Sequence, residues 1–204
     1  MTRRTFFSFH YKPDVTRSNV VKKSQIVKDR EDAGFLDSSA FEEAQKVDDD
    51  SLKRFLIKEM EGSSVVCALV GAETASRRWV RYEIQRGIWD ARGLMAVRIH
   101  TIADFDKKTS TMGVNPFDVL GIYVSEKKAY LVERASTSEK WTYSSDFSKD
   151  LPKWVYGDKL PTDGVHALSE FFPIYSWSST AHEKIGGWIE SAATQAKRWL
   201  SSGC

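Results

Sequence analysis

Short apolar runs alternate with longer amphipathic segments over residues 1–100. Residues 5–11 (TFFSFHY) are aromatic and β-prone, and residues 64–71 (SVVCALVG) form a nearly continuous apolar run, as expected for a central parallel strand covered on both faces. Residues 94–100 (LMAVRIH) predict a further strand, and residues 35–38 (FLDS) a weaker one. Strands that alternate with helices predict right-handed βαβ units and a doubly wound sheet.

Helical periodicity marks the segments between these strands. One helix is predicted to begin at Pro13, and a second follows Asp50, which can cap its first turn. A third is predicted after residue 74, where Thr74 or Ser76 can act as the cap. The apolar positions expected to face inward on this third helix are Val80, Ile84, Ile88 and Ala91.

The alternation ends after residue 100. Residues 122–124 predict the fifth strand of the sheet, and residues 130–134 with 140–143 predict a hairpin. Apolar residues recur at helical spacing near the end of the chain, which predicts an amphipathic helix over residues 182–201.

These elements predict an α/β protein with a flavodoxin-like arrangement, in which helices flank a central parallel sheet of about five strands. We expect an α/β core over residues 1–124 and an extension over residues 125–204 that consists of a hairpin, a loop and the last helix. Five of the seven tryptophans lie beyond residue 140, so the extension is expected to pack on the core.

Composition narrows the classes of function. The 30 basic and 28 acidic residues give a formal charge of +2, which provides no reason to expect a nucleic-acid or membrane partner. The two cysteines, Cys67 and Cys204, are expected to be free thiols in a reducing compartment, and no membrane-spanning stretch is recognised, so we expect a cytoplasmic protein. The four histidines are scattered and show no metal-ligand spacing, and we expect no metal site.

Ligands of open parallel sheets bind beyond the carboxyl ends of the strands, where helix N-termini present free N–H groups. The first predicted strand brings Ser8, Phe9 and His10 to that edge, and the second brings Asp37. Glu83 lies on the helix after the central strand and is predicted to share a face with Trp79 and Arg86, apart from the inward apolar stripe.

Three segments together resemble one known family: residues 6–11 (FFSFHY), 19–21 (NVV) and, above all, 77–84 (RRWVRYEI). They are similar to the TIR-like proteins of bacterial Thoeris anti-phage defence, the ThsB type. Residues 115–121 (NPFDVLG) are similar too, and the likeness runs in order from residue 3 to about residue 124. The resemblance implies a TIR fold.

The resemblance also implies an enzyme of the NAD glycohydrolase or ADP-ribosyl cyclase type. Such proteins cleave the nicotinamide–ribose bond of NAD and convert the ADP-ribose part into a signalling nucleotide, here expected to be cyclic, that activates a separate effector protein. NAD is then the substrate, and no further cofactor is implied. Self-association is a further hypothesis, with the acidic stretch 39–50 as the proposed contact.

The family's catalytic glutamate falls on Glu83, and a fixed carboxylate can stabilise the positive charge that develops on the ribose. Phe9 and Trp79 can stack on a base, although aromatic side chains at such positions equally often only pack in a core. The other residues predicted to bind substrate are Ser8, His10, Asn19, Asp37 and Arg78.

Two other functions are compatible with these residues. A TIR module can serve in assembly with partners and have no turnover, and a flavodoxin-like domain can bind a free nucleotide as a sensor. Substitution of Glu83 distinguishes the enzyme from both, because neither alternative needs a carboxylate beside the nucleotide.

Overall fold

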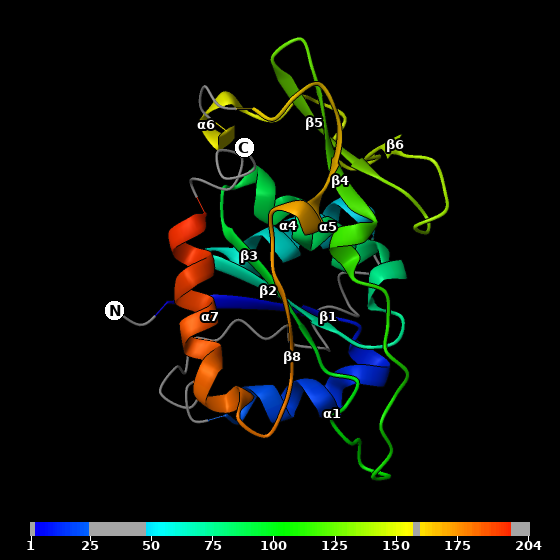
Figure 1. Cartoon of the computed structure of the whole chain (residues 1–204), viewed down its shortest axis with the longest axis vertical. Helices are drawn as coiled ribbons and strands as arrows, with labels where there is room; N and C mark the ends of the chain where they lie inside the picture. Colours follow the sequence, from blue (N-terminus) through cyan, green and yellow to red (C-terminus); the bar gives the residue numbers. More distant parts are fainter. Residues whose placement is uncertain (1–2, 25–47, 157–159, 197–204) are drawn as a thin grey trace.

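A parallel sheet of four strands lies at the centre of the molecule (Figure 1). The computed structural model describes residues 3–24, 48–156 and 160–196. In spatial order the strands are β1 (Thr5–Phe9), β2 (Val65–Val70), β3 (Gly93–Arg98) and β8 (Ile174–Ser176). All neighbours pair in parallel, so the carboxyl ends of the strands meet at one edge. The predicted α/β class is confirmed.

Helices of the described residues cover both faces of this sheet (Figure 1). The helices α1 (Tyr11–Lys22) and α7 (Ala181–Gln195) lie on one face, and α4 (Asp49–Met60) and α5 (Arg78–Trp89) lie on the other. Successive residues of a strand point to opposite faces. Phe7 accordingly belongs to the core under α1 and α7, whereas Phe6 belongs to the core under α4 and α5.

The ends of α4 and α5 differ in detail from the predicted ones. The side chain of Asp48, and not that of Asp50, accepts a hydrogen bond from the backbone N–H of Ser51 (2.6 Å) and caps α4. A 3₁₀ turn, η1 (Thr74–Ser76), precedes α5, and Arg77, the N-cap residue of α5, makes no side-chain hydrogen bond that caps the helix. The predicted caps at Asp50, Thr74 and Ser76 were therefore wrong, because each of these residues lies inside a helical turn.

The strand predicted over residues 122–124 exists, but it does not belong to the parallel sheet. It is part of β4 (Leu120–Ser125), which pairs antiparallel with β5 (Lys128–Glu133) and β7 (Gly164–Ala167) in a second sheet. The reason is the two-residue turn between β4 and β5. Glu126 and Lys127 both have positive φ (50° and 63°), the geometry of turns that reverse a chain into a tight antiparallel hairpin.

A short strand, β6 (Thr142–Tyr143), completes the second sheet and pairs with β5, with Val132 opposite Tyr143. This pairing confirms the hairpin predicted between residues 130–134 and 140–143. The remaining elements are short: η2 (Pro116–Asp118), α6 (Lys153–Tyr156) and η3 (Leu168–Glu170).

The last part of the chain returns to the parallel sheet. Strand β8 pairs with β3, Ala96 lying opposite Ile174, and α7 packs on β3 and β2. The rings of Tyr175 and Trp188 stack with their centroids 4.2 Å apart, which fastens β8 to α7. The boundary predicted at residue 124 falls inside β4.

Most of the acidic stretch 39–50, proposed as the self-association contact, lies outside the described residues. Two further predicted segments also extend outside them. These are the weak strand at residues 35–38 and the end of the last helix beyond residue 196. Within the described ranges, no helix is both long and apolar enough to cross a membrane.

Candidate active site

Glu83 lies in the second turn of α5 and points to the parallel sheet. Its carboxylate accepts a hydrogen bond from the hydroxyl of Ser8, and only 2% of the residue is exposed. Ser8 is the penultimate residue of β1. Its neighbours Phe7 and Phe9 point to the face that α1 and α7 cover, so Ser8 points to the α5 side. The structure thus joins two of the predicted site residues near the carboxyl edge.

Glu83 and Arg86, which were predicted to share a face apart from the inward apolar stripe, have different surroundings in the structure. Arg86 pairs with Asp90 instead (2.8 Å), and Glu83 is buried together with its helix neighbours Tyr82 and Gln85. The physical reason is that α5 is covered on both sides. The sheet lies on one side, and on the other Phe147, which follows the second sheet's β6, stacks on Tyr82 with ring centroids 5.4 Å apart.

Burial dominates the acid–base chemistry of Glu83. Removal from water raises its pKa from 4.5 to about 8, while the hydrogen bond from Ser8 acts in the opposite direction. Glu83 is therefore largely protonated at neutral pH in the conformation described. A carboxyl group with such a pKa can hold or accept a proton close to physiological pH.

This pKa shift predicts a pH-dependent stability. The pKa of Glu83 is about 8 in the folded state and 4.5 when unperturbed. The contribution of the protonated Glu83 side chain to the free energy of unfolding is therefore complete below about pH 4.5 and is lost as the pH rises through 8. Glu83→Gln removes the ionisable group, so the melting temperature of the variant minus that of the wild type should increase from pH 5 to pH 9. Thermal melts across this range measure the difference, and a difference independent of pH would contradict the assignment.

His10 follows β1 at the same edge, where its Nδ1 lies 3.8 Å from a carboxylate oxygen of Glu73. Burial lowers the pKa of His10, and the nearby Arg77 lowers it further, so the imidazole is neutral at pH 7. Arg77 pairs with Glu73. These three side chains surround the start of α5, which also carries Glu83.

Two other predicted substrate-binding residues, Phe9 and Asn19, belong to the α1 side of the sheet, whereas Glu83 belongs to the α5 side. Phe9 is 8% exposed and belongs to the core on the opposite face, under α1 and α7. Asn19 lies in the third turn of α1, roughly 12 Å along the helix axis from its first residue. Asp37 is outside the described residues. Substrate contacts of these three residues stay predictions.

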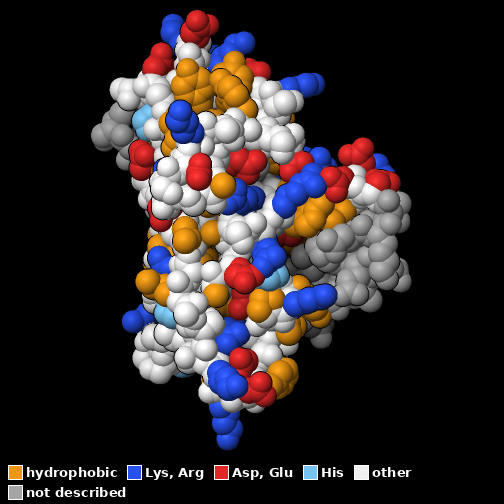
Figure 2. Space-filling model, turned by 90° about the vertical axis from the view of Figure 1, so that its right-hand side faces the viewer, with side chains coloured by type: hydrophobic (Ala, Val, Ile, Leu, Met, Phe, Trp, Pro, Cys, Tyr) orange, Lys and Arg blue, Asp and Glu red, His pale blue; other side chains and the backbone are white. Residues whose placement is uncertain are grey.

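Arg78 and Trp79 form a surface pair at the start of α5. The Arg78 guanidinium lies over the Trp79 ring, 4.6 Å from its centroid, and pairs with Asp49 (2.7 Å) and Asp146 (3.3 Å). Arg78 is therefore engaged with α4 and with the loop after β6, and a phosphate would have to compete with two carboxylates. Figure 2 shows one face of the molecule, on which basic and acidic side chains are intermixed in the same manner.

A second buried carboxyl group lies at the carboxyl edge, and the sequence reasoning above did not single it out. Asp14, in the first turn of α1, is 2% exposed and packs against Gly71 at the end of β2. An acidic residue a few positions after a strand, followed by an arginine three residues later, was the signal that was available. The same pattern is common on solvated helix surfaces, so it carries little information alone.

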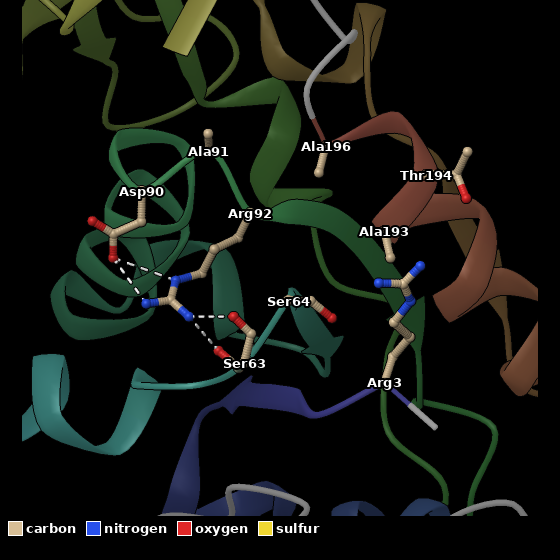
Figure 3. Close-up of a pocket in the computed structure, with 9 residues that line it drawn as sticks. All are labelled: Arg3, Ser63, Ser64, Asp90, Ala91, Arg92, Ala193, Thr194 and Ala196. Carbon is tan, nitrogen blue, oxygen red and sulfur yellow. Dashed lines mark hydrogen bonds and ion pairs between the residues drawn. The ribbon is translucent and has the colours of Figure 1, made fainter. Parts of the chain in front are cut away.

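The opposite edge of the sheet holds a cavity of about 570 Å³, shown in Figure 3. Its polar side chains are already paired: Arg92 donates to Asp90 (3.1 Å) and to the Ser63 hydroxyl (2.8 Å), and Arg3 pairs with Glu190 (3.1 Å). This cavity lies at the amino ends of the strands, away from Ser8 and Glu83. The candidate active site is therefore the carboxyl edge.

We found no set of side chains in the described part of the chain that could bind a metal ion. No group of three or more His, Cys, Asp or Glu side chains there is arranged to hold an ion. Cys67 lies in the middle of β2 and is fully buried, where desolvation raises the pKa of its thiol far above the ordinary value.

The parallel sheet with a helix-borne carboxyl at its carboxyl edge defines a TIR-like α/β protein. Residues 6–104 match the family model described as "Thoeris protein ThsB, TIR-like domain". A protein of Bacillus cereus (strain MSX-D12) named "Putative cyclic ADP-D-ribose synthase ThsB1" is 32% identical over 192 residues, which are 93% of this chain and 100% of that protein. The chain belongs to the Thoeris ThsB family, and the resemblance inferred from its motifs is confirmed.

Proposed function

We propose that this protein cleaves NAD at the nicotinamide–ribose bond and converts the ADP-ribose part into a cyclic signalling nucleotide. The observation that carries the proposal is Glu83, a buried carboxyl group that meets Ser8 near the carboxyl edge of a TIR-type sheet. The name of the Bacillus cereus relative supports a cyclic ADP-ribose product.

Glu83 has the chemistry that this reaction needs. When the bond breaks, nicotinamide leaves with both bonding electrons, and the ribose carbon develops oxocarbenium character that a carboxylate stabilises. Capture of that carbon by an adenine nitrogen closes a ring, and capture by water gives ADP-ribose. Both routes release a proton, for which the Glu83 carboxylate is the proposed acceptor.

The described conformation is a resting one in this proposal. Glu83 is 2% exposed, so a ribose reaches it only after side chains at the edge move. Opening would hydrate the carboxyl group and lower its pKa, which increases the ionised fraction when substrate is present. Self-association or an infection-derived trigger are the two inputs that we propose for this opening.

The product is proposed to act at a distance. A diffusible nucleotide activates a separate effector protein without a lasting contact between the two proteins. Supernatant from an active reaction, freed of this protein by filtration, should then be sufficient to activate the effector.

The test is chromatography with mass detection of NAD incubated with concentrated protein, with and without extract from phage-infected cells. Loss of NAD with equal release of nicotinamide supports an NAD-cleaving enzyme. A nucleotide one water lighter than ADP-ribose identifies cyclisation, whereas ADP-ribose itself identifies hydrolysis. Intact NAD under every condition would contradict the proposal.

A second candidate is a TIR module that assembles or binds nucleotide without turnover. The observation in its favour is the complete burial of a protonated Glu83, which the Ser8 hydroxyl satisfies as an ordinary structural partner. Analytical ultracentrifugation with NAD present distinguishes the two. Assembly together with unchanged NAD supports the module, and nicotinamide release excludes it.

A further inference from the structure

The chain leaves the sheet toward opposite faces at the ends of β1 and β2. Helix α1 follows β1 on one face, and η1 with α5 follows β2 on the other. Such a reversal creates the crevice in which open α/β sheets hold their ligands. Ser8 and Glu83 approach this crevice from the α5 side.

Asp14 approaches the same crevice from the α1 side. A Cβ atom placed on Gly71, directly after β2, would lie only 2.2 Å from Oδ2 of Asp14. The carboxyl group therefore occupies the space that a side chain at residue 71 would take, and a glycine there allows it to reach the end of β2.

The carboxyl of Asp14 is buried with an open hydrogen-bonding position. The residue is 2% exposed, and Oδ2 accepts no hydrogen bond from any described residue. Burial raises the pKa of Asp14 to about 6, against the opposing effect of Arg17. A buried acceptor without a donor is unfavourable, and such groups are retained where a ligand supplies the donor.

Arg17 is not the hydrogen-bond partner that the buried carboxyl group of Asp14 lacks. Its Nη1 lies 3.7 Å from Oδ1, the longest of its polar contacts. The guanidinium is satisfied by four nearer acceptors: the backbone oxygens of Pro13 (2.8 Å), Ile102 (3.0 Å) and Lys108 (3.0 Å) and the carboxylate of Asp104 (3.1 Å). Arg17 thus fastens the loop after β3 to α1 and has no need of a fifth partner.

That loop carries two further buried polar atoms without a hydrogen-bond partner in the described residues. They are Nδ1 of His100 and the hydroxyl of Ser110, which lie on either side of a backbone hydrogen bond from Ser110 to His100 (3.0 Å). His100 follows β3 closely, so these atoms belong to the same edge as Asp14. Unsatisfied polar atoms from α1 and from the loop after β3 indicate a surface prepared for a polar ligand.

We propose that Asp14 is a substrate-binding residue that accepts a hydrogen bond from a ribose hydroxyl of the bound nucleotide. The inference rests on the proposed function for the identity of that nucleotide. A carboxylate at the carboxyl edge of the sheet is a known partner of ribose hydroxyls in doubly wound folds, and it repels phosphate. Glu83 and Asp14 then hold the nucleotide from the two sides of the crevice, Glu83 at the reacting bond and Asp14 at a ribose.

The experiment compares Asp14→Asn with Asp104→Asn in the full chain. ADP-ribose is the probe, because its binding needs no turnover, and calorimetry measures the affinity. Asp14→Asn should weaken ADP-ribose binding about 10-fold, the effect of replacing a charged acceptor by a neutral one, and should raise KM for NAD more than it lowers kcat. Asp104→Asn changes a carboxylate on the same guanidinium and should leave affinity within about 3-fold of the wild type.

Gly71→Ala is the second variant and keeps the ionisable group. Its methyl group displaces the carboxyl of Asp14, so it should weaken ADP-ribose binding as Asp14→Asn does. Thermal melts accompany each titration. If Asp14→Asn no longer unfolds cooperatively, the ADP-ribose affinity of Gly71→Ala tests the role of Asp14 instead.

Three results would overturn the inference. They are wild-type affinity in Asp14→Asn, an equal loss in Asp104→Asn, and a wild type that does not bind ADP-ribose. NAD cleavage with the same KM in wild type and Asp14→Asn would reject the role of Asp14 and leave the proposed function intact. Binding that depends on Asp14 in a protein that never cleaves NAD would reject turnover and leave Asp14 as a nucleotide ligand.

Discussion

Glu83→Gln should lower the rate of nicotinamide release from saturating NAD by about 10³-fold, the order expected when an electrostatic partner of the transition state is lost. Glutamine has nearly the same shape and can still accept the hydrogen bond from Ser8. It cannot carry the negative charge that stabilises the developing oxocarbenium ion. The loss should therefore appear in kcat, with KM changed much less.

Glu73→Gln is the matched control for this substitution. Glu73 lies at the same edge and pairs with Arg77, but more than half of its side chain is exposed. Its replacement should leave kcat within about 3-fold of the wild type, as for most exposed ion-pair partners. A Glu83→Gln variant that retains more than about a tenth of wild-type kcat would contradict transition-state stabilisation by Glu83 and favour the assembly module.

A chain that ends at residue 170 should fail to fold into a soluble protein. The truncation removes β8 and α7, leaves β3 without a neighbour on one side, and uncovers Met95 and Val97 on the face that α7 covers. Each large apolar side chain withdrawn from the core forfeits about 1.5–3 kcal/mol. Losing the contacts of Ile185 and Ile189 as well brings the total close to the whole stability of a domain, about 5–15 kcal/mol.

The soluble fraction after expression and the cooperativity of the thermal melt measure this effect. Two substitutions in the full chain calibrate it. Ile189→Ala, in the buried face of α7, should destabilise by about 2–5 kcal/mol, whereas Trp154→Ala, at a largely exposed position of α6, should change stability little. A soluble 1–170 chain with a cooperative melt would show that the parallel sheet folds without its fourth strand.

The local elements near the sheet centre were predictable because their signals are local. The apolar run at residues 65–70 is a strand with all six residues buried, and Val80, Ile84 and Ile88 face the core as expected. The fourth predicted member of the inward apolar stripe, Ala91, was wrong, because α5 ends at Trp89 and Ala91 has a positive φ (52°). Strand β8 was missed because it has only three residues and no alternating pattern. Its strand conformation comes from pairing with β3, a contact between segments far apart in the sequence.

Sequence reasoning predicted which residues lie at the site, but it did not predict that Glu83 is buried there. Motif resemblance indicated Ser8 and Glu83, and the structure joins them. Helical spacing placed Glu83 apart from the inward apolar stripe, because spacing records only positions around one helix. Burial depends on what the helix faces in the folded chain, here the parallel sheet with Ser8, and that burial raises the pKa of Glu83.

The sequence by itself determined the alternation of strands and helices, from which the parallel sense of the sheet follows, and the presence of a glutamate on the helix after the central strand. These features follow from periodicity and chain order, which act over a few residues. Only the tertiary structure decided that residues 122–124 join a second sheet, that Glu83 is buried, and that Asp14 meets Gly71. Each of these depends on which distant segments pack together, and the free energy of burial and of strand pairing is set by such contacts and not by local spacing.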